Sequence, residues 1–168
     1  KATTTAHSNV AIGFEALLNE DTGRKNVAIG YEALKDQNSD ADNYNVAVGY
    51  QAGGNVTTGT QNSLIGAATG DALTGGGDNT ALGAFALSGD TNGSKSVAIG
   101  RFALYVQNFS SSTDVFNVAV GHGTGSAITT GFQNTLVGGL AGDALTDADY
   151  NIAIGQGALG ADTLGSRA

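Results

Sequence analysis

The sequence has no cysteine, proline, methionine or tryptophan, and only 13% of its 168 residues are charged. Without cysteine the chain has neither a disulfide framework nor a thiolate metal site. Hydrophobic residues make up 40% of it, which is too many for a disordered tail of such low charge. The chain is therefore expected to fold, with packing and backbone pairing as its sources of stability.

Basic residues are also scarce. Seven Lys and Arg residues stand against fifteen Asp and Glu residues, which gives a formal net charge of −8. That charge repels nucleic-acid backbones and anionic membrane surfaces. No apolar run approaches the roughly 18 residues that cross a bilayer, and residues 1–20 show no signal-peptide pattern. The sequence thus predicts neither nucleic-acid binding nor membrane insertion.

Aromatic residues are few as well, with five Tyr and six Phe. Most of the other apolar side chains are Ala, Val, Ile and Leu, so any core is thin and built from small groups. A thin core requires many repeats or several subunits. The chain supplies the repeats, because the Asn-Val-Ala-Ile-Gly of Asn9–Gly13 returns at Asn26–Gly30 and, with small changes, seven more times.

Nine short coils follow from this repeat. Consecutive repeat glycines lie 17, 19, 17, 17, 17, 21, 17 and 17 residues apart, so two connections absorb insertions of two and four residues while the coils stay constant. We expect residues 1–168 to form a single repeat segment, with coils starting near residues 9, 26, 45, 62, 79, 96, 117, 134 and 151. The repeat glycines are Gly13, Gly30, Gly49, Gly66, Gly83, Gly100, Gly121, Gly138 and Gly155.

Each unit alternates between two faces. Val10 and Ile12 point to one face and Asn9, Ala11 and Gly13 to the other, as in a five-residue strand. We expect the Val and Ile side chains to form columns inside the stack, with about 4.8 Å between coils and roughly 40 Å over all of them. The Asn, Ala and Gly face is then the outer one, either a subunit interface or a solvated surface.

A second short inward segment follows three or four residues after the repeat glycine. Each coil then ends in a polar turn such as Asn19–Gly23. Two strands and two turns per coil predict an all-β protein, a parallel β-solenoid. The inward segment has the sequence Ala-Leu at Ala16-Leu17, Ala33-Leu34, Ala86-Leu87, Ala103-Leu104 and Ala158-Leu159.

A longer period lies above the coils. Residues 57–74 match residues 129–146 at 12 of 18 positions, an offset of 72, so the coils come in groups of four. Such duplication favours a fibre that grows by copying segments. Because the chain starts at Lys1, lacks polar caps and stops where a tenth coil is due, we expect it to be an excerpt of a longer fibre.

The Asn-Val-Ala-Ile-Gly units, followed by Ala-Leu or Ala-Gly, resemble the repeats of trimeric autotransporter adhesin heads. They resemble even more the repeat arrays of phage tail-fibre proteins, notably those of marine cyanophages. The resemblance covers residues 9–167 and implies a left-handed parallel β-roll in a homotrimer. The chain departs from the pattern in its coil lengths of 17–21 residues, in Ser96 where other coils have Asn, and in Thr124-Gly125 where others have Ala-Leu.

Two glycine-rich stretches match nucleotide-binding patterns without their context. Gly155–Gly160 fits Gly-x-Gly-x-x-Gly, but its first glycine belongs to the repeat, and no helix or ribose-binding acid follows. Gly89–Lys95 ends in Gly-Ser-Lys without phosphate-loop spacing. We interpret both as repeat turns and predict no cofactor.

The titratable residues offer no catalytic set. His7 and His122 have no visible partner, and stacked coils place acids and serines on separate rungs, so we interpret both histidines as surface or interface residues. We predict no catalytic, cofactor-binding or metal-binding residue and no enzymatic activity. Two aspartate pairs have turn positions suited to Ca²⁺ but meet no calcium-loop consensus: Asp40 with Asp42, and Asp147 with Asp149.

Three sets of side chains recur at fixed places. The repeat asparagines are expected to form a stacked amide ladder, at Asn9, Asn26, Asn45, Asn62, Asn79, Asn117, Asn134 and Asn151. Aromatic residues just after the repeat glycine either form a stripe for carbohydrate stacking or cover coil edges and subunit seams, at Phe14, Tyr31, Tyr50, Phe85 and Phe102. Threonine pairs recur only every fourth coil, at Thr57-Thr58 and Thr129-Thr130.

We therefore expect an extracellular structural fibre, a virion tail fibre that positions binding to a host receptor. Its expected partners are copies of itself as a homotrimer, neighbouring fibre segments, and a glycan or protein receptor on a cell surface. The main alternative is the trimeric adhesin head of a bacterial surface protein. An ice- or polysaccharide-binding solenoid is less favoured, because it needs threonines or aromatic rings on adjacent rungs.

Overall fold

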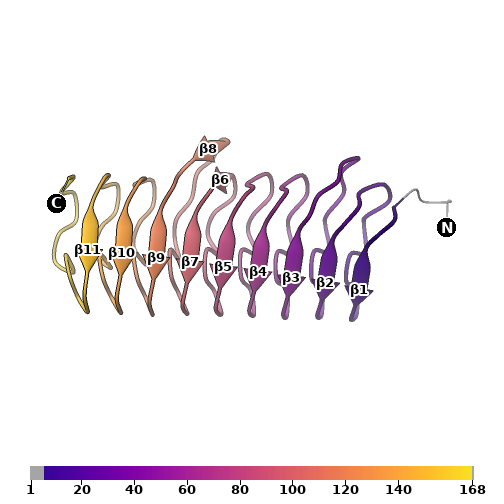
Figure 1. The fold of residues 1–168 in the computed structure, drawn as a ribbon, viewed down its shortest axis with the longest axis horizontal. Helices are drawn as coiled ribbons and strands as arrows, with labels where there is room; N and C mark the ends of the chain where they lie inside the picture. The colour runs from indigo at the N-terminus through magenta and orange to yellow at the C-terminus, as the bar shows by residue number, and fades with distance from the viewer. Residues whose placement is uncertain (1–5, 168) are drawn as a thin grey trace.

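The structure, a computed structural model, describes residues 6–167 and consists of parallel coils stacked in a row (Figure 1). The large sheet has nine strands in the order β1-β2-β3-β4-β5-β7-β9-β10-β11, and β6 pairs with β8 in a small second sheet. Residues 6–167 contain no helix, so the predicted all-β parallel solenoid is confirmed. The strands are β1 (Val10–Ile12), β2 (Val27–Ile29), β3 (Val46–Val48), β4 (Ser63–Ile65), β5 (Thr80–Leu82), β6 (Gly93–Ser94), β7 (Val97–Ile99), β8 (Thr113–Asp114), β9 (Val118–Val120), β10 (Thr135–Val137) and β11 (Ile152–Ile154).

The coils stay in register across both insertions. Val27 lies opposite Val46, and Val97 lies opposite Val118, although these pairs are 46 − 27 = 19 and 118 − 97 = 21 residues apart. The extra residues leave the large sheet, and at the second insertion β8 pairs with β6 in the preceding turn. Figure 1 shows β8 standing out from the row of coils. The constant scaffold with variable connections is therefore confirmed.

The two faces of the sheet are the reverse of the expectation. The middle residue of each strand points inward, and Ala28, Ala47 and Ala98 are completely buried. The Val and Ile residues on either side are partly or largely exposed. The interior of so narrow a coil is already filled by the leucines of the second segment, so it accepts a methyl group at the strand. The bulkier β-branched side chains fit only on the outside.

The second segment points inward as predicted, but it is not a strand. Ala33 and Leu34 are completely buried. Leu34 has a φ of 47°, in the left-handed region, so the chain turns here instead of extending. Its N–H still donates to Ala52 O in the next coil at 3.1 Å. Backbone pairing between coils therefore continues through the turn.

Two kinds of coil share the core, and they explain the four-coil period. In the first kind, the fourth residue after the repeat glycine is Leu and the seventh is polar; in the second, the fourth is Gly and the seventh is Val, Leu or Ile. Two coils of one kind follow two of the other. The leucine coils have Leu17 with Glu20, Leu34 with Gln37, Leu87 with Asp90, Leu104 with Gln107 and Leu159 with Asp162, and the glycine coils have Gly53 with Val56, Gly70 with Leu73, Gly125 with Ile128 and Gly142 with Leu145.

The space left by the glycines is filled from the strands. A Cβ atom on Gly70 would lie 2.9 Å from Leu64 Cδ2, and one on Gly53 would lie 2.7 Å from Leu64 Cδ1. Leu64, the middle residue of β4, is buried where most strands have Ala. Leu136 has the corresponding contacts with Gly125 and Gly142. A larger strand residue thus compensates for each pair of glycine coils.

The compensation predicts coupling between Leu64 and Gly70. Leu64→Ala leaves a cavity and is expected to lower the unfolding free energy by about 3 kcal/mol. Gly70→Leu alone overpacks the same space, although φ = 56° at this position accepts leucine, as φ = 55° does at Leu87. The double variant is expected to be more stable than the sum of the two losses predicts, by about 1–3 kcal/mol. Chemical denaturation of the four proteins measures this coupling, and additive losses would contradict it.

Candidate functional site

The outward face of the large sheet is the most distinctive surface of the molecule. Two columns of side chains run along it, one from the first residue of each strand and one from the third. We call them the first and second columns. The first column contains Val10, Val27, Val46, Ser63, Thr80, Val97, Val118, Thr135 and Ile152, and the second contains Ile12, Ile29, Val48, Ile65, Leu82, Ile99, Val120, Val137 and Ile154.

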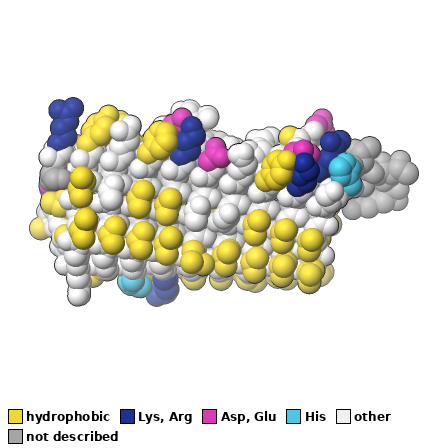
Figure 2. All heavy atoms as spheres, in the orientation of Figure 1, with side chains coloured by type: hydrophobic (Ala, Val, Ile, Leu, Met, Phe, Trp, Pro, Cys, Tyr) yellow, Lys and Arg dark blue, Asp and Glu magenta, His cyan; other side chains and the backbone are white. Residues whose placement is uncertain are grey.

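The columns are apolar and carry no charge. The second column is apolar on every coil, and the first has a hydroxyl residue on three of them. In Figure 2 hydrophobic side chains lie in rows that run along the stack, across the strands, with no charged side chain inside the rows. The face is also substantially exposed, since Ile12, Ile65 and Leu82 keep 59%, 41% and 44% of their accessible surface. Contiguous exposed apolar surfaces of this kind mark interaction sites.

The asparagine ladder is confirmed, but inside the coils. Asn62 is completely buried and its Nδ2 donates to Gly76 O at 2.9 Å. Its Oδ1 accepts the backbone N–H of Asn79, in the next coil, at 3.1 Å. The same two bonds recur along the stack, at Asn9, Asn45 and Asn134 among others. The ladder therefore ties each strand both to the following turn and to the next coil.

The two insertions interrupt this ladder. Beside the first, the Nδ2 of buried Asn26 has no hydrogen-bond partner. Beside the second, Ser96 takes the place of Asn, so no unpaired amide arises, and Gln107 Nε2 donates to the Ser96 hydroxyl at 3.2 Å. Gln107 Oε1 also accepts Nδ2 of Asn117 at 2.9 Å. In regular coils the asparagine Nδ2 donates to a backbone carbonyl 14 residues later, and the longer connection moves that carbonyl out of reach. Ser96, which has no amide to satisfy, therefore fits this coil.

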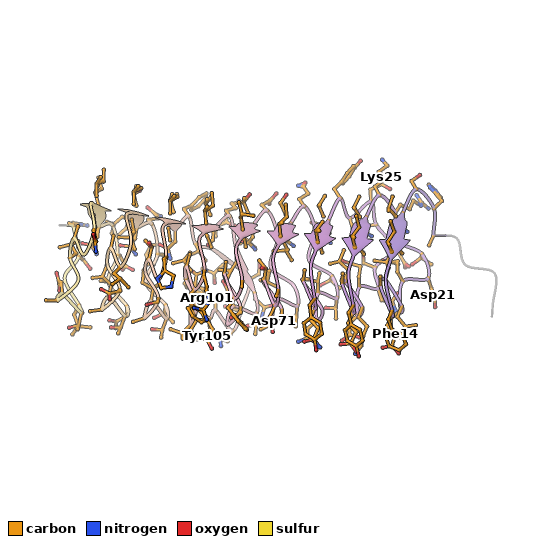
Figure 3. All side chains as sticks on the ribbon, turned by 90° about the horizontal axis from the view of Figure 1, so that it is seen from below. Phe14, Asp21, Lys25, Asp71, Arg101 and Tyr105 are labelled. Atoms are coloured by element: carbon orange, nitrogen blue, oxygen red, sulfur yellow. The ribbon has the colours of Figure 1, made fainter. Side chains whose placement is uncertain are left out.

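The aromatic residues after the repeat glycines form two separate stacks. Phe14 and Tyr31 stack with their ring centroids 5.3 Å apart, and Tyr31 and Tyr50 with theirs 5.2 Å apart. Phe85 and Phe102 stack at 5.4 Å. Figure 3 shows Phe14 at the end of this row, on the side opposite Lys25. Because each ring covers the face of the next, the rings present mainly edges to solvent, which favours the covering of coil edges over sugar stacking.

Lys25 and Lys95 form matching clusters beside the two insertions. Lys25 Nζ donates to Asp42 Oδ2 at 2.8 Å and lies 4.8 Å from the ring centroid of Tyr44. The hydrogen bond to Asp42 raises the pKa of Lys25, and the same bond lowers the pKa of Asp42. Lys95 Nζ donates to Asp114 Oδ2 at 2.7 Å, and this bond raises the pKa of Lys95. Both clusters hold an inserted connection against the preceding coil.

The other aspartates considered for Ca²⁺ also have protein partners. Asp40 accepts a hydrogen bond from the Thr22 hydroxyl. Asp147 accepts one from the Thr146 hydroxyl at 3.1 Å, and Asp149 accepts the Phe132 N–H at 3.0 Å. Across residues 6–167, no three His, Cys, Asp or Glu side chains gather closely enough to hold a metal ion.

The histidines and glycine-rich stretches lie apart from one another. His7 Nδ1 lies 3.1 Å from the hydroxyl oxygen of its neighbour Ser8. His122 packs edge-on to Phe102 at 6.3 Å. Gly155–Gly160 follows β11 as a turn, and Gly89–Lys95 forms the turn that contains β6. The structure brings none of these stretches together with the histidines.

The threonine pairs belong to a longer column of threonines that the sequence pattern did not reveal. Thr57, Thr74 and Thr91 lie on successive coils, each 17 residues from the next. The Thr57 hydroxyl donates to Thr74 O at 3.2 Å, and the Thr74 hydroxyl donates to Thr91 O at 3.1 Å. Thr129 and Thr146 continue the pattern in the second group of coils. These hydroxyl protons are used within the stack, so the column is part of the scaffold.

Several hollows lie on the flank of the coils, and two of them contain titratable groups of interest. An open one of about 520 Å³ is lined by Phe102, Tyr105, His122 and Leu140, among others. A smaller one of about 100 Å³ lies between Glu32, Lys35 and Asp71. Burial raises the pKa of Asp71, and its Oδ1 lacks a hydrogen-bond partner. Ser126 lines the larger hollow together with His122, but within residues 6–167 no hydrogen bond joins their side chains.

Residues 6–167 include no helix with the length and apolar character of a membrane span. Comparison with known protein families, curated proteins and solved structures gives no match to this chain. The candidate site is therefore chosen on geometry alone, and the two outward columns are the principal one because they form an exposed apolar face.

Proposed function

We propose that this chain is a structural segment of an extracellular fibre and that it assembles with identical chains through the two outward columns. The observation that carries the proposal is the second column, which is apolar on all nine coils and lies on an exposed face. The repeat's resemblance to phage tail fibres makes a homotrimeric virion tail fibre the proposed setting. Its role is mechanical, since it holds receptor-binding parts of the fibre away from the particle.

Size and charge support self-association. With strands about 4.8 Å apart and about 3.3 Å per residue, the face of nine three-residue strands covers on the order of 400 Å², a size at which apolar patches mark interaction sites. Each chain carries a formal net charge of −8, so identical chains repel each other over most of their surface. The uncharged columns are where that repulsion is smallest.

The regular spacing of the coils also favours an identical partner. Side chains in each column repeat at the strand spacing, about 4.8 Å. A second copy has the same spacing, so its side chains match those of the first coil by coil along the whole length of the face. A partner with any other repeat matches over a few coils and then falls out of step. Rigidity follows, because every coil contributes to the contact.

The mass of the assembly tests the proposal. Light scattering at several concentrations is expected to give three times the chain mass of 16.6 kDa. Leu82→Lys buries a charge in the second column and is expected to yield monomers with unchanged circular dichroism, because residue 82 points out of the coil. Thr130→Lys, an exposed turn position with the same added charge, serves as the control and should keep the trimer. A folded monomer of the unaltered chain would overturn the proposal.

A further inference from the structure

Three hydroxyl residues interrupt the first column. They are Ser63 on the fourth coil, Thr80 on the fifth and Thr135 on the eighth. Their side chains make no hydrogen bond within the described chain, unlike Thr57 and Thr74, whose hydroxyls bond to the next coil. Figure 2 shows the upper hydrophobic row interrupted near the middle of the molecule.

We infer that Ser63, Thr80 and Thr135 fix the axial register between identical chains, so that each coil faces the same coil of its partner. The inference rests on the proposed self-association. The partner is a second copy of this chain, and the three residues determine specificity because the remaining members of both columns are apolar. An entirely apolar column has nearly the same energy at every displacement by whole coils.

A hydroxyl group can form a hydrogen bond with an identical hydroxyl group on another chain. It donates one hydrogen bond and accepts others, so the Ser63 hydroxyls of neighbouring copies can bond to one another, and three of them can close a ring. When a copy is displaced along the axis, the same hydroxyl faces a valine or isoleucine and loses water without gaining a partner. Such an unpaired polar group is strongly unfavourable in a contact that excludes solvent.

The spacing of the three residues makes the alignment unique. They lie on the fourth, fifth and eighth coils, so their separations are 5 − 4 = 1, 8 − 5 = 3 and 8 − 4 = 4 coils, all different. A displacement by one, three or four coils therefore brings one hydroxyl pair together, and any other displacement brings none together. Only zero displacement pairs all three.

The insertions alone leave one ambiguity. They recur after four coils, with Lys25 and Lys95 in matching clusters, so a displacement of four coils superposes one inserted connection on the other. In that arrangement Ser63 faces Thr135, but Thr80 faces Ile152 and its hydroxyl is unpaired. The hydroxyl residues thus exclude the one displacement that the insertions tolerate.

Oxidative cross-linking tests the register directly, since the chain has no cysteine of its own. Val97→Cys and Val118→Cys place thiols in the first column on adjacent coils. Two differently tagged chains are co-expressed, either both with Val97→Cys or one with each substitution. Copies with Val97→Cys are expected to cross-link to each other, and the mixed pair at least about tenfold less, because a one-coil displacement leaves four of the six hydroxyls of two chains unpaired.

Removing the hydroxyls is expected to release the register. A chain with Ser63→Val, Thr80→Val and Thr135→Val should still assemble by light scattering, but the mixed cross-link should rise at least about tenfold relative to the matched one. Assembly with an unchanged ratio would overturn the register inference and leave the proposed function intact. A chain that stays monomeric before any of these changes would overturn both.

Moving the hydroxyls by one coil gives the positive test. The shifted chain is expected to pair with the unaltered chain one coil out of step, so that Val97→Cys in the shifted chain cross-links to Val118→Cys in the other. Matched cross-links between the two chains would contradict the inference even if the triple valine variant folds poorly. The shifted chain has Val46→Ser, Ser63→Thr, Thr80→Val, Val118→Thr and Thr135→Val.

Discussion

Gly100→Ala is expected to lower the unfolding free energy on the order of 4 kcal/mol. Gly100 has a φ of +125°, a conformation that side chains with a Cβ rarely adopt, and the added Cβ would lie 2.4 Å from Gly121 O in the next coil. Because coil spacing is fixed by hydrogen bonds above and below, neither coil can move away without breaking its neighbours' pairing. Thermal and chemical denaturation measure the loss.

Gly155→Ala separates the two causes of this loss. Gly155 has nearly the same φ, +121°, but no atom lies within 4 Å of the position that its Cβ would take. This variant therefore carries the backbone strain without the collision, and about 1–3 kcal/mol is expected. Equal losses for the two variants would show that the contact between stacked glycines contributes nothing.

Asn62→Ala is expected to lower the unfolding free energy by about 4 kcal/mol, through two broken hydrogen bonds. It leaves Gly76 O without its amide donor and the Asn79 N–H without its acceptor. Both Asn62 and Asn79 are buried, so water does not replace the lost partners. The loss should appear in denaturation, with faster amide hydrogen exchange at Asn79.

Asn9→Ala is the matched control for the ladder. Asn9 makes the same pair of bonds, donating to Gly23 O at 2.9 Å and accepting the Asn26 N–H at 2.8 Å. It is only partly buried, so water can take over part of the bonding, and about half the loss is expected. If Asn9→Ala were as harmful as Asn62→Ala, burial would not be what gives the ladder its strength.

The repeat made the number and register of the coils predictable. Asn-Val-Ala-Ile-Gly aligns with itself in one way, and the insertions fall between strands, so Val27 and Val46 could be paired from the sequence. The amide ladder was predictable for the same reason, since identical side chains at a fixed period stack. Strand length was less predictable. Five residues were expected in each strand, but the flanking Asn and Gly lie outside it and only the three residues between them form the strand.

The inward face was predicted wrongly, for a physical reason. Alternation shows that Val27 and Ile29 share one face and Ala28 the other, but it does not show which face is inside. Hydrophobicity alone favours burying Val and Ile. Because Leu34 already occupies the interior of the narrow coil, only the smaller Ala28 can be buried beside it. An expectation based on transfer free energy alone omits this volume limit.

In the sequence, the four-coil arrangement of the core was visible only as a repeat of similar residues with no apparent structural cause. Its cause, Leu64 filling the space above Gly53 and Gly70, depends on contacts between coils. The threonine column escaped notice because its members are paired in some coils and single in others, as at Thr57-Thr58 and Thr74. Both features needed the stacked geometry before their function as scaffold was apparent.

Paired leucine and glycine coils also set the steps in which this solenoid can change length. Deleting one glycine coil removes one of the two glycines, Gly53 or Gly70, that make room for Leu64. Deleting one leucine coil likewise breaks the alternation of two leucine coils with two glycine coils. Removing or duplicating a complete set of four preserves every contact across the join. Gene rearrangements that survive selection should therefore alter the length of the solenoid in increments of about 19 Å, four times the strand spacing of about 4.8 Å.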